Sequence, residues 1–267
     1  MRYSMLILSL LLILACKKGE VKSMVNDSTT DTVVKPADTI AKPVDTVVTP
    51  IDTIIVKPTD PNMGKQLNYL ALGDSYTIGE SVERYENFPN QLVNELTKKG
   101  LIINPPTIVA RTGWTTSELQ SGIKDSGAPE HKFDIVTLLI GVNNQYRGES
   151  KDVYRKEFKE LLQTAINFTK DKKSHVFVIS IPDWGATTHG QQSGRDPQVI
   201  AMEIDAFNVI NKEETLAAGL NYSNITPFSR LALSDKTLVA GDGLHPSGKM
   251  YAGWVANVAP LVLTNLK

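Results

Sequence analysis

The sequence predicts an α/β domain in which a five-stranded parallel sheet lies between two layers of helices. One observation is alternation: from about Lys65 to Lys267, five strand-like apolar segments alternate with amphipathic, helix-like segments. A second observation is that several strand segments are apolar without interruption, as in parallel strands covered on both faces. A stretch of roughly 200 residues is also long enough for one domain with a substantial core.

The elements follow one another in a regular order. Strands are expected at about residues 67–72, 107–111, 133–140, 176–181 and 221–226. Helices are expected at about 88–99 before Gly100, after Thr115-Thr116-Ser117-Glu118, at about 198–218 before Gly219, and from about Ser247 onward. A further long helix follows the third strand, with one apolar face made of Val153, Phe158, Leu161, Leu162, Ala165 and Ile166. The last helix is expected to turn inward Met250, Trp254, Val258 and Leu261.

The first sixteen residues indicate export and anchoring. Arg2 precedes an apolar run at 5–15, which is shorter than the about 20 residues that span a bilayer but fits a signal peptide. The run ends Ile13-Leu14-Ala15-Cys16 and resembles a bacterial lipobox, which implies cleavage after a signal peptide of residues 1–15 and lipidation of Cys16. The alternative is an ordinary signal peptide with an incidental cysteine. Lys17-Lys18 provides no inner-membrane retention signal, so we expect an extracytoplasmic protein anchored to the outer membrane or cell surface.

Residues 16–63 are predicted to form a disordered stalk that carries the lipidated Cys16. The pair Asp-Thr recurs every seven residues, at Asp31, Asp38, Asp45 and Asp52. A proline in each repeat rules out a continuous helix, and the absence of aromatic residues leaves no core to form. Each Asp-Thr is followed by Val or Ile and resembles a bacterial O-glycosylation acceptor; compositional drift in a linker is the equal alternative.

Candidate site residues follow the predicted strands, at the rim where ligands bind in parallel α/β sheets. They include Ser75 after the first strand, Gly113 after the second, Asn143 and Asn144 after the third, and Trp184 after the fourth. Asp242 and His245 lie just before the last helix. Each also has a plain structural interpretation, because serine caps helices and glycine, asparagine and aspartate form turns.

These residue types together suit acyl transfer. A serine hydroxyl attacks an acyl carbonyl once a base removes its proton, histidine is that base near neutral pH, and a carboxylate holds the imidazole in place. Of the four histidines, His131 and His175 precede strands and therefore belong to the opposite rim. His189 is on the correct side but has no acid three residues before it, whereas His245 has Asp242 there.

Four short blocks, Gly73-Asp74-Ser75-Tyr76, Gly113, Gly141-Val142-Asn143 and Asp242-Gly243-Leu244-His245, resemble those of the SGNH (GDSL) hydrolase family and occur in its order. The resemblance covers residues 64–267. It implies a flavodoxin-like sheet of order 2-1-3-4-5, with Ser75 as nucleophile, His245 as base and Asp242 as its orienting acid. It also implies an oxyanion hole formed by the Ser75 and Gly113 N–H groups and the Asn143 side chain, without a metal or organic cofactor. Asn144 replaces an aspartate that commonly supports this loop in the family.

The sequence defines the substrate less well than it defines the catalytic residues. Asn144, Tyr146, Arg147 and Trp184 lie on rim loops and are candidate substrate contacts, although such residues also cover a core edge. We expect a serine ester hydrolase acting on small acyl esters, O-acetylated glycans among them, and a monomer. A lysophospholipase, a thioesterase or an acyltransferase would use the same residues, and a non-catalytic glycan-binding module is a further alternative. The net charge of −1 gives no field that favours nucleic acid.

Overall fold

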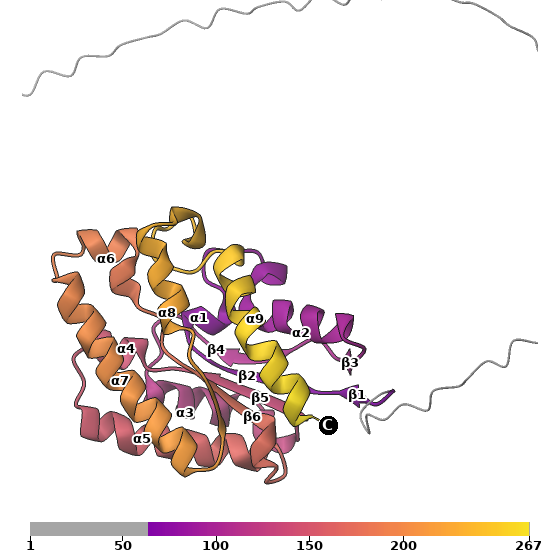
Figure 1. The fold of residues 1–267 in the computed structure, drawn as a ribbon. Coiled ribbons are helices and arrows are strands. Elements are labelled where there is room, and N and C mark those ends of the chain that lie inside the picture. Colours follow the sequence, from indigo (N-terminus) through magenta and orange to yellow (C-terminus); the bar gives the residue numbers. More distant parts are fainter. Residues whose placement is uncertain (1–63, 267) are drawn as a thin grey trace, which may run out of the picture. The chain divides into compact units, whose positions relative to one another are not determined.

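The computed structural model describes residues 64–266, which form a three-layer α/β/α sandwich (Figure 1). The central sheet contains β2 (Tyr69–Gly73), β4 (Thr107–Ala110), β5 (Ile135–Leu139), β6 (Val176–Ile179) and β7 (Asn221–Ser223). All pairings are parallel and the order is β4-β2-β5-β6-β7. This confirms the predicted fold and the order 2-1-3-4-5. The predicted signal peptide, Cys16 and stalk lie outside the described residues.

A second, two-stranded sheet was not predicted. It pairs β1 (Gln66–Leu67) in parallel with β3 (Ile102–Ile103). The predicted first strand, 67–72, is interrupted at Asn68, whose backbone groups bind Asp134. The Asn68 N–H donates to the Asp134 carboxylate, and the Asn68 carbonyl accepts the Asp134 N–H. The chain therefore changes sheets one residue before β2 begins.

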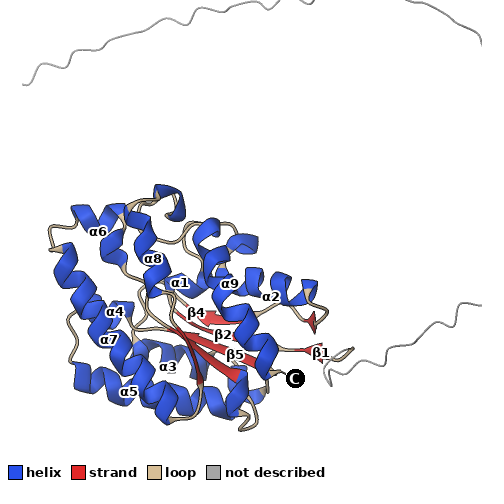
Figure 2. Ribbon diagram, viewed as in Figure 1, coloured by secondary structure: helices blue, strands red, loops and turns tan. Residues whose placement is uncertain are grey.

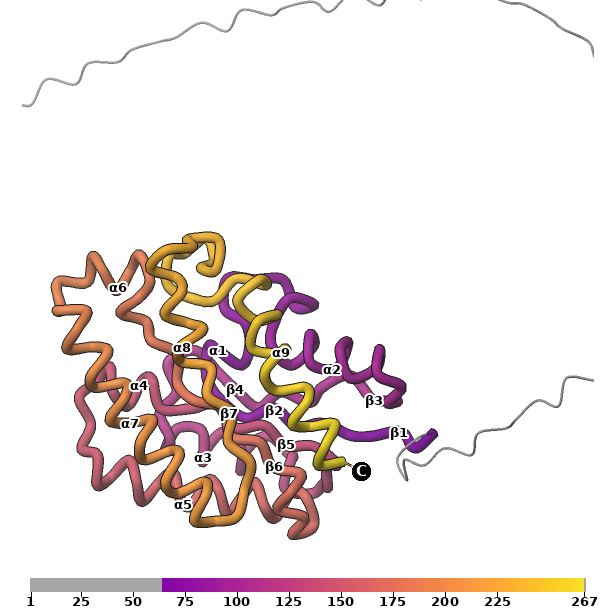
Figure 3. Tube along the Cα trace, viewed as in Figure 1, coloured from indigo at the N-terminus to yellow at the C-terminus, as the bar shows by residue number. Residues whose placement is uncertain are grey.

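Helices cover both faces of the central sheet (Figures 1 and 2). On one face, α2 (Phe88–Lys98) and α9 (Gly248–Asn265) pack side by side; on the other, α5 (Lys151–Phe168) lies between α3 (Thr116–Asp125) and α7 (Pro197–Ala217). Shorter helices are α1 (Ser75–Ile78), α4 (Val142–Tyr146), α6 (Thr188–Gln192) and α8 (Thr226–Ser229). The Cα trace shows β7 leading into α8 beside α9 (Figure 3). Within residues 64–266, none of the helices combines the length and the apolar character that crossing a bilayer requires.

Single-turn 3-10 helices complete the chain, at η1 (Arg84–Glu86), η2 (Ala128–Glu130), η3 (Lys173–His175), η4 (Trp184–Ala186), η5 (Arg230–Leu233) and η6 (Lys236–Leu238). The core is centred on β2 and β5, whose residues are all buried, as uninterrupted apolar strands require. The predicted apolar face of α5 needs one correction. Val153 is 50% exposed, and its neighbour Tyr154 is buried instead, because Tyr154 is four residues before Phe158 and shares its helix face.

Candidate active site

Ser75 is positioned by a sharp turn between β2 and α1. β2 ends at Gly73, Asp74 adopts an extended conformation as the N-cap, and Ser75 is the first residue of α1. The turn is tight: a Cβ on Gly73 would lie 2.1 Å from Thr77 Oγ1 and 2.4 Å from the Leu139 carbonyl oxygen, so only glycine fits. The packing therefore fixes Ser75 at the carboxyl end of the sheet, where it is nearly buried.

The N-cap residue Asp74 has an unusual environment for a carboxyl group. Its Oδ1 accepts a hydrogen bond from the Tyr76 N–H at 3.0 Å, but its buried Oδ2 has no hydrogen-bond partner within residues 64–266. Burial raises the pKa of Asp74 to about 7, against the weaker opposing effect of the Tyr76 N–H. At and below neutral pH, Asp74 is therefore protonated, and the core contains no unpaired negative charge at this position.

Asp242 and His245 form a compact hydrogen-bonded turn. The His245 Nδ1 lies 2.6 Å from Asp242 Oδ2, while Asp242 Oδ1 accepts the backbone N–H groups of Leu244 and His245 at 2.9 and 3.0 Å. Ser81 Oγ also donates to Oδ2, at 2.7 Å. Partial burial raises the pKa of Asp242, but the bonds from His245, Leu244 and Ser81 outweigh it and hold that pKa well below the usual value. Asp242 is therefore an ionised acceptor at neutral pH and also builds the turn.

A cleft of about 290 Å³ brings the predicted residues together at the carboxyl ends of the strands. Its lining combines the predicted nucleophile and base with loop residues from the neighbouring strands: Ser75, Tyr76, Thr112, Gly113, Val142, Asn143, Tyr146, Trp184, His189, Leu244 and His245. The Tyr76 ring packs edge-on against His245, with 5.7 Å between the ring centroids. The cleft thus gathers residues that lie up to 170 positions apart in the sequence.

Gly113 and Asn143 lie in this cleft, as expected of oxyanion-hole donors. Gly113 has a φ of +85°, a left-handed conformation that favours glycine. Asn143 donates one amide hydrogen to the Trp114 carbonyl at 2.9 Å, which ties α4 to the loop that carries Gly113. An asparagine amide has two hydrogens, so the second remains for a ligand.

Arg147 does not line the cleft; it braces the Gly113 loop from outside. Its Nη2 donates to the Gly113 carbonyl at 2.5 Å and its Nη1 lies 3.2 Å from Glu118 Oε1. Glu118 in turn accepts the Thr115 N–H at 2.8 Å at the start of α3. The geometry therefore favours a positioning role for Arg147 over the predicted contact with substrate.

Asn144, a predicted substrate contact, lies outside the cleft. The side chain is fully buried and is absent from the cleft lining. Its amide donates to Thr116 Oγ1 and to Glu149 Oε2, both at 2.7 Å, and its carbonyl accepts the Thr116 N–H at 3.2 Å. Glu149, which the sequence did not single out, supplies the supporting carboxylate that the third block lacks.

Tyr146 and Trp184 form one wall of the cleft, so a substrate contact stays a prediction for both. Their rings meet edge-on with 5.4 Å between centroids. Trp184 is buried and donates from Nε1 to Gln145 Oε1 at 2.9 Å, whereas Tyr146 is 56% exposed. A buried ring thus supports an exposed one at the mouth of the cleft.

His189, the alternative base, also lines the cleft. Its backbone N–H donates to the Gly243 carbonyl at 2.8 Å. Within residues 64–266, the ring of His245 pairs with a carboxylate, that of Asp242, and the ring of His189 does not. The carboxylate of Asp183, six residues before His189, pairs with Arg230 Nε at 2.8 Å. No group of three or more His, Cys, Asp or Glu side chains suited to a metal ion occurs in the described part of the chain.

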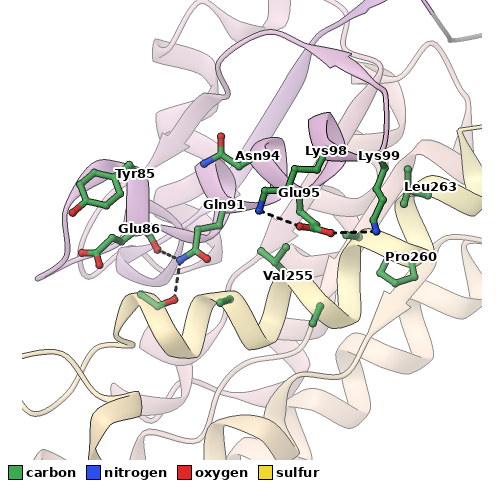
Figure 4. A pocket seen from close by; sticks show the side chains of 14 residues that line it. Tyr85, Glu86, Gln91, Asn94, Glu95, Lys98, Lys99, Val255, Pro260 and Leu263 are labelled. Carbon is green, nitrogen blue, oxygen red and sulfur yellow. Dashed lines mark hydrogen bonds and ion pairs between the residues drawn. The ribbon is translucent and has the colours of Figure 1, made fainter. Parts of the chain in front are cut away.

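A larger cavity lies elsewhere, between α2 and α9, with a volume of about 730 Å³ (Figure 4). Its lining includes Tyr85, Gln91, Val255 and Pro260, and Glu95 pairs there with Lys98 and Lys99. It contains neither a serine nor a histidine. The smaller cleft is therefore the candidate active site.

Comparisons with known proteins agree with this geometry. The model of the GDSL-like lipase/acylhydrolase family matches residues 71–252. A lipase/acylhydrolase from Enterococcus faecalis has 19% identity and a TM-score of 0.57, over 75% of this chain and 97% of that one. An acetylxylan esterase from Geobacillus stearothermophilus has 16% identity and a TM-score of 0.55, over 75% and 94%. A phospholipase A1 from Streptomyces albidoflavus NA297 has 15% identity and a TM-score of 0.54, over 74% and 99%. At identities this low, the TM-scores show a shared fold alone. No curated protein sequence gave a match.

Proposed function

This chain belongs to the GDSL-like lipase/acylhydrolase family, and on that premise we propose that it is a serine esterase acting on small acyl esters. The observation that carries the proposal is the placement of Ser75 in one cleft with His245, whose Nδ1 lies 2.6 Å from the Asp242 carboxylate. That hydrogen bond holds the imidazole with Nδ1 protonated, which leaves Nε2 as the basic nitrogen.

In the proposed reaction, Ser75 Oγ attacks the ester carbonyl carbon while His245 Nε2 accepts the hydroxyl proton. The oxyanion that forms is stabilised by the Ser75 and Gly113 N–H groups and by the free amide hydrogen of Asn143. The tetrahedral intermediate then collapses, His245 returns the proton to the departing alcohol, and an acyl group remains on Ser75. Water activated by the same nitrogen releases the acid.

The size and lining of the cleft support a short acyl group. Its volume of about 290 Å³ is at the lower end of the range for ligand sites. The wall of Tyr146 and Trp184 supports a sugar on the alcohol side, and acetylxylan esterases occur among the structural neighbours. We therefore propose O-acetylated glycans as the substrate class.

The test is hydrolysis of p-nitrophenyl acetate, p-nitrophenyl dodecanoate and an acetylated glycan by the full chain. We expect the two acetates to be cleaved and the dodecanoate to be a poor substrate. Ser75→Ala should reduce kcat by about 10⁴–10⁶-fold. Labelling of Ser75 by a fluorophosphonate, detected by intact mass, gives a direct readout of the nucleophile. A Ser75→Ala protein that retains its rate would overturn the assignment.

For the location, we propose that Cys16 carries a lipid that anchors the enzyme to the cell envelope, as its place after Ile13-Leu14-Ala15 suggests. Two acyl chains hold a protein stably at a membrane where one does not. Cys16→Ala should move the protein from the membrane fraction to the soluble fraction. Complete retention of the variant in membranes would contradict the proposal.

A further inference from the structure

A second cavity meets the catalytic cleft at Tyr146. It is a groove of about 600 Å³ between α7 and the segment that joins α4 to α5, and we refer to it as the α4–α7 groove. Tyr146 lines both the groove and the cleft. The other residues that matter here are Lys151, Arg195, Val199, Met202 and Glu203. A molecule bound along the groove would therefore pass over the Tyr146 ring to reach Ser75.

Four side chains in contact with one another support the wall between the two cavities. Trp184 Nε1 donates to Gln145 Oε1 at 2.9 Å, and Gln145 Nε2 donates to Glu203 Oε2 at 2.5 Å. Arg195 donates to the same Glu203 oxygen at 2.6 Å, and its guanidinium lies 5.5 Å from the centre of the Trp184 ring. These four side chains form a closed ring of contacts. Such a ring holds the exposed Tyr146 in place before any ligand arrives, which lowers the entropy cost of binding.

The lining of the groove distinguishes between occupants. Arg147 lines the groove as well as bracing the Gly113 loop. It joins the charged groups of Lys151, Arg195 and Glu203 there, and an acyl chain would remove water from these groups without offering them hydrogen bonds. Sugar hydroxyls can take the place of that water, because they both donate and accept hydrogen bonds. The exposed Tyr146 ring and Met202, which is 64% exposed, offer the apolar surface that the C–H face of a pyranose covers.

We propose that the α4–α7 groove binds the glycan chain of an O-acetylated polysaccharide, and that Tyr146 is the stacking residue that leads this chain to the catalytic cleft. The proposal rests on the esterase function proposed above and adds where the alcohol side of the substrate lies. In this arrangement, binding energy gained by remote sugar units accelerates attack on the acetyl group, as remote contacts do in other enzymes.

The experiment compares kcat/KM of the full chain for acetylated xylo-oligosaccharides of one to six units and for p-nitrophenyl acetate. In the unmodified protein, kcat/KM should rise about tenfold or more with chain length, as expected when further contacts form. Tyr146→Ala and Met202→Glu should abolish most of that rise, and Tyr146→Phe should retain it because the ring face remains. The matched control is Tyr85→Ala, which removes a tyrosine that is 68% exposed in the other cavity (Figure 4) and should leave the rise intact.

The outcomes separate this inference from the function it rests on. If p-nitrophenyl acetate is cleaved but kcat/KM does not depend on glycan length, the groove is not a glycan subsite and the esterase function stands. If rates rise instead with acyl length in a p-nitrophenyl series, and Tyr146→Ala removes that rise, the groove holds an acyl chain and the inference is overturned. If no ester is cleaved, the esterase function itself fails.

Discussion

Arg147 offers a test that separates two roles for one residue, because the sequence predicts a substrate contact and the structure favours a brace. Its bond to the Gly113 carbonyl, at 2.5 Å, holds the loop that presents the proposed oxyanion donor. A hydrogen bond from a charged donor contributes about 1.5–3 kcal/mol. The Arg147 side chain is 45% exposed, so solvent screening reduces this to roughly 1–1.5 kcal/mol. The bond already exists in the free protein, so it affects kcat only by placing the Gly113 N–H for the oxyanion. If about 1.4 kcal/mol acts in this way, kcat is about tenfold lower without it.

The perturbation is Arg147→Met, which keeps the length of the side chain and removes its donors. With p-nitrophenyl acetate, we expect kcat to fall about tenfold while KM stays nearly constant, because the lost interaction acts on the oxyanion and not on the bound ester. Arg155→Met is the matched control, since Arg155 of α5 pairs with Glu213 and Glu214 of α7 and does not line the cleft. An unchanged kcat for p-nitrophenyl acetate would show that the brace argument is wrong. A raised KM for acetylated glycans beside it would show that Arg147, which also lines the α4–α7 groove, contacts the glycan.

Three other expectations follow from the contacts around the site. Because the folded protein holds a proton on Asp74 up to about pH 7, while the unfolded chain releases it near 3.8, stability should fall as pH rises between these values. Asp74→Asn keeps the helix cap and should raise Tm at pH 8 but not at pH 3. The gain in the free energy of unfolding at pH 8 has an upper bound of roughly 4 kcal/mol. Equal Tm values for the variant and the unmodified protein at pH 8 would contradict the raised pKa of Asp74. Asn144→Asp should lower Tm, because it sets a carboxylate against Glu149, and Glu149→Gln should restore it in the double variant; an unchanged single variant would refute the pairing. Ser81→Ala removes a donor from the Asp242 carboxylate and should lower kcat by about threefold to tenfold; a lower Tm with full kcat would mean that this bond only stabilises the fold.

The features predictable from sequence are those that local patterns encode. The apolar run before Gly73 ends in a serine, and the structure places Ser75 just after β2 at the rim. The spacing of Asp242 and His245 likewise predicted a pair, which the structure forms at 2.6 Å. Both features need only a strand end or a single turn. A parallel sheet then brings the two together, since all its strands end at the same edge.

The features that the sequence did not reveal depend on contacts between distant segments. The position of Asn144 after the third strand predicts a rim residue. Its burial depends on Thr116, 28 positions away, and sequence spacing does not encode that contact. Glu149 resembles any other acidic residue until Asn144 is placed beside it. Arg147 binds a backbone carbonyl, which every residue possesses, so no residue type in the sequence identifies Gly113 as its partner.

The turn around Asp242 means that the acid and base of the site form one preassembled unit. Their hydrogen bonds span three residues or fewer, whereas bonds that fasten the unit to the rest of the cleft, from Ser81 to Asp242 and from the His189 N–H to the Gly243 carbonyl, span 161 and 54. Displacing the turn by about an ångström would move His245 relative to Ser75 in the cleft and leave the bond between His245 and Asp242 unchanged. The NMR signal of the His245 Nδ1 proton would therefore persist in protein that has lost its activity, and it would report the integrity of the turn independently of catalysis.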